Sequence, residues 1–249
     1  MLLRLEIGRS ASVFLVAILA MFLPRLLLGA TENTVFAAIY GMGSIIAWAM
    51  VTVFICYRLF SYYCLGADLF LHITSRSRWA VLTARAAVLG VLTFALSVAS
   101  MAMDWTFFQP IDGSLAGADL VWLLAARLLS VASFFALVVF LVVVTKYLRT
   151  KILMATLFPV FLFLVILGLG VTYWGLSETS GQEFFIGVTD RYTNAPARAS
   201  LVPFFALGGD EFVPSVARVS LIGNAVLLVV CSVAARLVVR RQRADFYRL

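Results

Sequence analysis

Six long apolar stretches, separated by shorter polar ones, set the pattern of this chain. Each apolar stretch is close to or longer than the roughly 20 residues that an α-helix needs to cross a hydrocarbon core of ~30 Å. We therefore expect an all-α polytopic membrane protein in which residues 1–249 form a single transmembrane domain. The six predicted spans cover about residues 11–30, 34–57, 79–103, 118–145, 152–175 and 215–239.

The polar interruption between the second and third predicted spans, DLFLHITSRSRWAVLTAR, has an apolar stripe of its own. Apolar residues recur every four positions from Leu65 to Ile73, and Asp68, His72 and Arg76 recur at the same spacing. A helix in this segment would have one apolar face and one charged face. Such a helix is expected to lie on the membrane surface, with its polar side toward something soluble.

Composition and charge agree with a membrane protein and indicate its orientation. Hydrophobic residues make up 63% of the chain and charged residues 12%, with a mean hydropathy of +1.06, whereas about a quarter of the residues in soluble domains are charged. The net charge of +7 reflects basic residues between the spans, so no nucleic-acid partner is expected. Fourteen of the 19 Lys and Arg residues fall on one side of the predicted topology. The positive-inside rule then places both termini in the cytoplasm.

The residues needed for most enzymatic chemistry are missing from this sequence. His72 is the only histidine, so a metal or haem site with several histidines cannot form. There is no G-x-x-x-x-G-K-[ST] phosphate loop and no G-x-S-x-G turn. The three cysteines contain no C-x-x-C pair, and a disulfide framework is not expected. We predict no catalytic, cofactor-binding or metal site in this chain.

Two features within the predicted spans have alternative interpretations. Gly41, Gly43 and Ser44 would permit close helix contact, although glycine is common in membrane helices. Arg127 lies about ten residues into the fourth predicted span. Its charge either reaches outward to the surface or an acidic partner, or it lines a passage for an anionic group. The sequence leaves both alternatives open.

Together these segments resemble the membrane subunit of an ABC exporter of the ABC-2 permease type. The N-terminal LLRLEIGRS is similar to the interfacial elbow helix that opens such subunits. DLFLHITSRSRWAVLTAR is similar to their cytoplasmic coupling helix between spans two and three, although its serine has no preceding proline as many members have. The long outer loop at 176–214 stands where the family places short re-entrant helices between spans five and six. A basic tail after span six is also typical.

The resemblance implies an exporter subunit in the plasma membrane of a bacterium, without an ATPase site of its own. A separate ATPase subunit would bind ATP and Mg, and two copies of each subunit would assemble. The residues expected to contact the ATPase are Asp68, His72, Ser75, Arg76 and Arg78, with a smaller second contact from Lys146, Arg149 and Lys151. The alternative is that this basic surface contacts only anionic lipid headgroups.

The outer loop contains two apolar patches in an otherwise polar stretch. Their aromatic residues are Phe184, Phe185, Phe204 and Phe205. These patches either return into the membrane interface and act as an exit gate, or cap the outer ends of the helices.

The substrate expected for apolar spans with few charges is amphipathic: a hydrophobic peptide, a lipid or a lipophilic drug. Two other functional classes remain open. One is a non-transporting membrane subunit, such as an immunity or sensor-associated protein. The other is an intramembrane enzyme acting on lipid, which would need a nucleophile and a base that the polar segments lack.

Overall fold

Helices account for nearly all of the structure that is described. The computed structural model of the 249-residue chain describes residues 2–31, 34–65, 78–107, 117–146, 152–153, 155–164 and 214–246. Within these ranges there is no β-strand. The expected all-α class is therefore confirmed for the described part of the chain.

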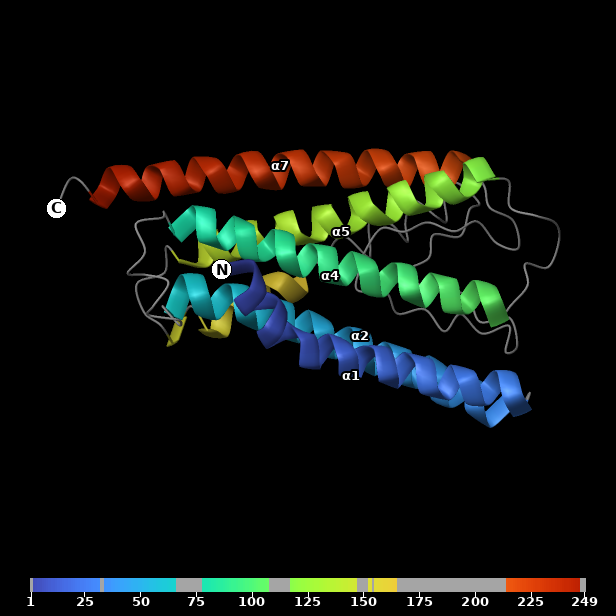
Figure 1. The fold of residues 1–249 in the computed structure, drawn as a ribbon. Helices are drawn as coiled ribbons and strands as arrows, with labels where there is room; N and C mark the ends of the chain where they lie inside the picture. Colours follow the sequence, from blue (N-terminus) through green and yellow to red (C-terminus); the bar gives the residue numbers. More distant parts are fainter. Residues whose placement is uncertain are drawn as a thin grey trace.

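Long helices run side by side, and α1, α2, α4 and α5 alternate in direction, whereas α7 runs in the same direction as α5 (Figure 1). They are α1 (Leu2–Thr31), α2 (Thr34–Phe60), α4 (Arg78–Phe107), α5 (Gly117–Thr145) and α7 (Pro214–Phe246), and α2 continues directly into a π-helical turn, η1 (Ser61–Leu65). Residues 155–164 are also helical. Both ends of the chain lie at the same end of the bundle, together with the end of α2, the start of α4 and the end of α5 (Figure 1).

Four of the described helical segments are long and apolar enough to cross a membrane. They are Ile46–Leu65, Arg78–Ala99, Arg127–Thr145 and Ile222–Arg241. These segments lie within or overlap the predicted second, third, fourth and sixth spans. Shorter apolar helical segments, Ile7–Leu23 and Ala155–Leu164, overlap the predicted first and fifth spans.

The helix ends differ from the predicted boundaries at two places. The elbow expected at residues 1–10 is the beginning of α1, whose first turns run at an angle to the rest of the helix (Figure 1). Helix α7 continues past residue 239 to Phe246 and includes most of the basic tail. Arginine and glutamine are good helix formers. An apolar run therefore marks the membrane-length part of a helix, not the point where the helix ends.

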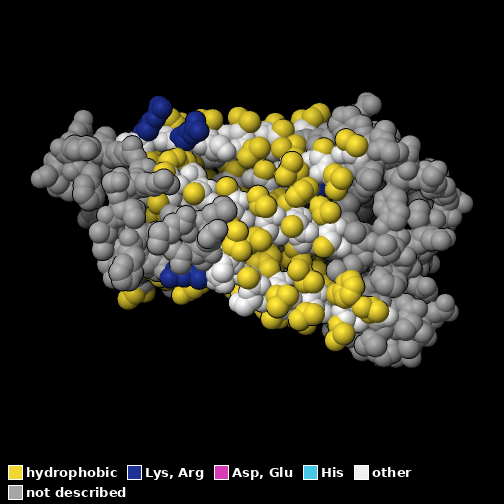
Figure 2. All heavy atoms as spheres, viewed as in Figure 1, with side chains coloured by type: hydrophobic (Ala, Val, Ile, Leu, Met, Phe, Trp, Pro, Cys, Tyr) yellow, Lys and Arg dark blue, Asp and Glu magenta, His cyan; other side chains and the backbone are white. Residues whose placement is uncertain are grey.

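Large apolar side chains cover the outside of the helices. Val53, Val91 and Ile222 are 69%, 68% and 65% exposed, and Figure 2 shows many hydrophobic side chains across the middle of the molecule. Monomeric soluble proteins rarely expose apolar surface on this scale. The surface therefore fits a membrane protein, with lipid as the solvent for these side chains.

The core forms where α5 passes between the other helices. Phe134, Val138 and Val142 on α5 are fully or almost fully buried, and they belong to the same apolar cluster as Val51 on α2 and Leu82 on α4. Helix α5 packs against α7 on one side and α4 on another, while α1 packs mainly against α2. A residue on α5 can therefore contact several other helices at once.

Gly43 lies where α1 and α2 come close together. A Cβ atom at this position would be only 3.2 Å from the carbonyl oxygen of Ala20 on α1. That oxygen belongs to the helix backbone and cannot move without displacing α1. Close approach of two helices over a small residue is typical of packing within membranes. For Gly43, the structure supports the packing interpretation.

We expect Gly43→Val to lower the stability of the protein in detergent. Overpacking typically costs about 1–3 kcal/mol, because the new side chain would push against the Ala20 carbonyl. The measurement is the midpoint of thermal unfolding. Gly8→Val is the matched control, since no atom lies within 4 Å of a Cβ at Gly8. Equal shifts for the two variants would contradict close packing at Gly43.

Candidate functional site

The end of α2 departs from regular α-helix just before the predicted coupling segment. From Ser61 to Leu65 the chain forms the π-helical turn η1, and four of its five residues, Ser61 to Cys64, are buried. A π-helical turn widens the helix and shifts its hydrogen bonds, and such turns occur frequently at functional sites. Here η1 packs against both α4 and α5. A displacement of this turn would therefore affect three helices.

Lys146, one residue beyond the end of α5, joins α5 to η1. Its Nζ donates a hydrogen bond of 2.6 Å to the carbonyl oxygen of Tyr63 and lies 4.8 Å from the centre of the Tyr63 ring. Its backbone N–H donates to the carbonyl of Val142 at 3.2 Å. The thiol of Cys64 donates to the same carbonyl at 3.3 Å. Two successive residues of η1 thus bond to the last turn of α5. We call these four residues the α5–η1 joint.

The ammonium group of Lys146 is in an environment that disfavours its charge. Burial lowers its pKa below the ordinary value, and the positive charge of Arg78 lowers it further. Arg78 is the first residue of α4. The structure therefore brings Lys146 and Arg78, both predicted ATPase-contact residues, close enough to interact electrostatically.

The burial of Arg85 could not be seen from the sequence. Arg85 is one of the fourteen basic residues on the cytoplasmic side of the predicted topology, and its side chain is 1% exposed. The guanidinium lies over the ring of Tyr62 in η1, 4.4 Å from the ring centre. Arginine binds aromatic faces through a cation–π interaction, which gains strength when water is excluded. Tyr62 thus links η1 to α4, as Tyr63 links it to α5.

Arg127 lies in a second polar region, on the face of α5 that also carries Ser130 and Ser133. These three side chains follow one another at three-residue intervals and are all buried, with Arg127 2% exposed. The hydroxyl of Ser133 donates to Oδ1 of Asn224 on α7 at 2.7 Å, and its oxygen also lies 2.8 Å from the carbonyl oxygen of Ser130. Asn224 is 1% exposed. Arg127 is therefore not at the surface of the bundle, and its passage-lining role stays a prediction.

Most of the other predicted site residues lie outside the described ranges. These are Asp68, His72, Ser75, Arg76, Arg149, Lys151, Phe184, Phe185, Phe204 and Phe205. Of the predicted coupling segment, 68–77 lie outside the described residues and 78–85 form the first turns of α4. Both η1, before the gap, and Arg78, after it, lie close to Lys146. The predictions for the coupling helix and the outer gate remain predictions.

The residues that contact Arg85, Lys146 and Ser133 could not be identified from the sequence. Tyr62, Tyr63 and Asn224 gave no signal in the apolar pattern, because Tyr is common near membrane interfaces and one Asn does not interrupt an apolar run. A polar residue within a span is a useful indication in itself, since it usually faces other helices. Applied to Asn224, this rule would have indicated a helix–helix contact.

Comparison with known proteins does not assign this arrangement to a family. No family model matches the chain, and no curated protein or solved structure matches it either. Among the described residues, no three His, Cys, Asp or Glu side chains come together in a group that could hold a metal ion. The chemistry available to the described sites is cationic and hydrogen-bonding.

We expect Lys146 to make stability increase with pH in the alkaline range. The folded chain binds the Lys146 proton less tightly than the unfolded chain, so stability rises between the lowered pKa and the ordinary value of 10.5. The measurement is the unfolding midpoint against pH, for the wild type relative to Lys146→Met, which has no titrating group. Lys146→Arg, which stays charged throughout, should also lack the increase. A pH dependence that is the same in all three proteins would contradict the prediction.

We expect Ser133 and Asn224 to be energetically coupled. In a double-mutant cycle of Ser133→Ala and Asn224→Ala, the interaction energy should be roughly 0.5–1.7 kcal/mol, as for other hydrogen bonds between membrane helices. The measurement is unfolding by sodium dodecyl sulfate. Thr93→Ala with Asn224→Ala is the control cycle, because the Thr93 hydroxyl donates to the backbone of its own helix, at Leu89. A coupling energy near zero in the first cycle would show that the bond does not hold α5 against α7.

Proposed function

We propose that this chain is the membrane subunit of an ATP-driven exporter of the ABC-2 permease type. In this proposal it has six spans with both termini in the cytoplasm, sits in a bacterial plasma membrane, and forms a homodimer that binds two copies of a separate ATPase. The substrate is an amphipathic molecule moved outward. The chain itself carries no ATP-binding site.

The single observation that supports this function best is the α5–η1 joint. The two segments predicted to contact an ATPase are next to described residues that lie close together. The first segment lies between η1 and the start of α4 at Arg78, and the second begins at Lys146. The bond from Lys146 to the Tyr63 carbonyl connects these points directly. A soluble partner bound there would contact three helix ends together.

The distribution of charge at this end of the bundle also supports a cytoplasmic partner. Arg58 and Arg78 lie at helix ends, and Lys146 directly follows α5, at the end of the bundle where the two termini lie (Figure 1). Basic residues gather on the cytoplasmic side of membrane proteins. An ATPase with acidic side chains at its contact surface would be complementary to them.

In the proposed mechanism, the joint carries motion from the ATPase into the membrane. Closure of the ATPase on ATP would pull on the segment between η1 and α4. Because Tyr62 contacts Arg85 and Tyr63 contacts Lys146, the displacement would reach α4 and α5 together. Packed helices move as rigid bodies. The result would be a change in the angles between α2, α4 and α5, with α1 moving with α2 and α7 moving with α5.

We expect reversal of two charges in the coupling segment to uncouple the ATPase. In the variant Asp68→Lys with Arg76→Glu, stimulation of ATP hydrolysis by the chain should fall severalfold, because both charges would repel their partners on the ATPase. The measurement is the rate of ATP hydrolysis by the co-purified complex in lipid vesicles, compared with the rate of the ATPase subunit alone. Membrane insertion should be normal.

Arg240→Glu is the matched control, as it reverses an exposed charge near the same end of the bundle but outside the two predicted contacts. It should leave stimulation close to the wild-type value. If stimulation were unchanged in the coupling-segment variant, the contact would not be where we place it. If no ATPase co-purified, a non-transporting membrane subunit would be the better assignment.

A further inference from the structure

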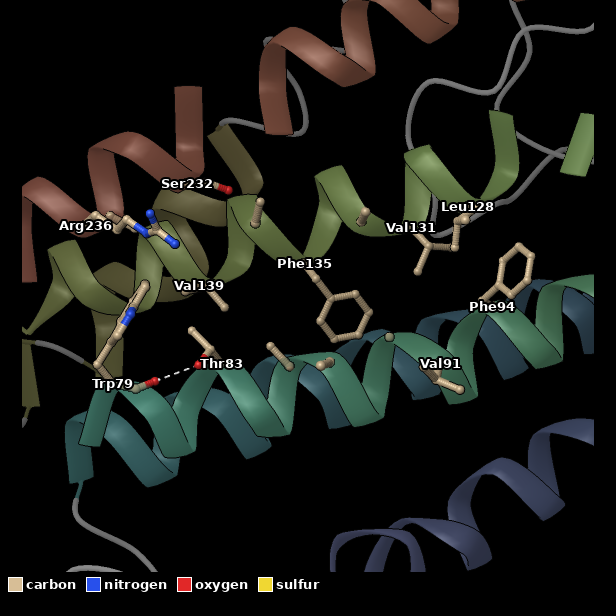
Figure 3. Close-up of a pocket in the computed structure, with 16 residues that line it drawn as sticks. Trp79, Thr83, Val91, Phe94, Leu128, Val131, Phe135, Val139, Ser232 and Arg236 are labelled. Carbon is tan, nitrogen blue, oxygen red and sulfur yellow. Dashed lines mark hydrogen bonds between the residues drawn. The ribbon is translucent and has the colours of Figure 1, made fainter. Parts of the chain in front are cut away.

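An apolar groove runs along α4 where α5 and α7 leave it partly uncovered. Its volume is about 410 Å³, and its wall includes small residues such as Ala87 and Gly90 on α4 and Ala136 on α5. Phe135 projects into its middle (Figure 3). The small residues make room between the helices, and Phe135 gives the groove an aromatic floor.

Polar groups line only one end of this groove. Trp79 and Thr83 lie there on α4, and Ser232 and Arg236 lie there on α7 (Figure 3). The Thr83 hydroxyl donates to the carbonyl of Trp79 at 3.0 Å. Arg236 is exposed, and its guanidinium is the only charged group in the groove wall among the described residues. This end of the groove therefore presents a cation beside an indole ring.

The opposite end of the groove is apolar and opens on the outside of the bundle. Val91 and Leu128 form part of its wall and are 68% and 53% exposed. Both lie within membrane-length segments. From Trp79 to Phe94 the groove follows α4 for about 22 Å, at 1.5 Å per residue. This is more than half of a hydrocarbon core of ~30 Å, so the groove runs from one membrane surface past the middle of the membrane.

The groove is too small to enclose another transmembrane helix. A helix is about 10 Å across, so a length of about 20 Å fills on the order of 1,500 Å³, more than the groove holds. A hydrocarbon chain is narrow enough to lie between α4 and α5. Its cost of leaving the bilayer is small because the groove wall is as apolar as lipid. The guanidinium of Arg236 at the surface end then selects the headgroup to which the hydrocarbon chain is attached.

We propose that this groove binds one anionic membrane lipid, with an acyl chain along α4 and its phosphate at Arg236. Basic pockets between transmembrane helices recognise acidic headgroups in this way. Trp79 is near the end of the membrane-length segment Arg78–Ala99, and indole rings favour the headgroup region. The inference does not rest on the proposed exporter function, because it concerns binding to the chain alone.

The test is native mass spectrometry of the purified, delipidated full chain in neutral detergent. Dioleoyl phosphatidylglycerol and dioleoyl phosphatidylcholine are added separately, since they differ in headgroup charge and share their acyl chains. The wild type should retain one molecule of the anionic lipid in clear preference to the zwitterionic one. Arg236→Gln should weaken the anionic lipid about fivefold, as expected for one cation near a headgroup. Arg240→Gln, at an exposed arginine outside the groove wall, should not.

A second pair of variants tests the acyl chain. Ala87→Leu places a larger side chain in the groove, and Ala84→Leu makes the same change at an exposed alanine on α4 outside it. Ala87→Leu should reduce retention of both lipids, and Ala84→Leu should reduce neither. Equal retention of the two lipids by the wild type, or equal loss in the two arginine variants, would overturn the proposal. So would a lipid-independent dimer that Ala87→Leu dissociates, since that would assign the groove to a second copy of the chain.

Discussion

A hydrocarbon environment offers the backbone no hydrogen-bond partner outside the protein, and the described structure depends on this constraint. Its long segments are α-helices because only an intrasegment ladder satisfies every N–H and C=O. The one described irregularity within a membrane-length segment is η1, where the π-helical turn disturbs the ladder. It is buried, and the ammonium of Lys146 donates to one of its carbonyls. The irregular backbone is therefore placed where other parts of the chain can satisfy it.

The same constraint explains where the buried charges lie. Moving an arginine into a membrane is expensive, and such residues are almost always turned toward other helices. Arg85 lies against the aromatic face of Tyr62, and Arg127 is buried on the face of α5 that carries Ser130 and Ser133. Arg85 lies near the end of the bundle that holds the termini, and Arg127 lies in the part of α5 farther from that end. Helix α5 contributes to both, since its last turn belongs to the α5–η1 joint.

The distribution of polar groups distinguishes two kinds of site in this protein. The α5–η1 joint is made of groups that bond to one another, so it is suited to holding α2 and α5 together, and the contact of Arg85 with Tyr62 adds α4. The groove along α4 has its one charged group exposed at its end and a wall that is otherwise almost entirely apolar. It is suited to an amphiphile. Motion of α4 relative to α5 would change the width of this groove, so a link between the two sites follows from their shared helices.

How much of the fold was predictable can be seen from particular elements. Six membrane-length segments were expected from apolar length alone; the described residues contain four, and these overlap the predicted second, third, fourth and sixth spans. The predicted end of the sixth span, at about residue 239, is close to the end of the membrane-length segment at Arg241, whereas α7 itself continues to Phe246 because arginine continues a helix as readily as leucine does. The site was less predictable. Lys146 and Arg78 were selected for their charge, but Tyr62, Tyr63 and Asn224, which contact charged or polar groups, were not, since their roles come from neighbours more than 20 residues away in sequence.

The sequence by itself determined that this chain is helical and suited to a membrane, because hydrophobicity over about 20 residues is a local property. It also indicated orientation through the uneven distribution of Lys and Arg. Only the tertiary structure decided which charges are buried, that η1 meets Lys146, and that small residues on α4 leave a groove beside α5 and α7. These features depend on which faces of separate helices meet. An apolar run has no strong preference for the face it turns toward lipid, and packing between the helices makes that choice.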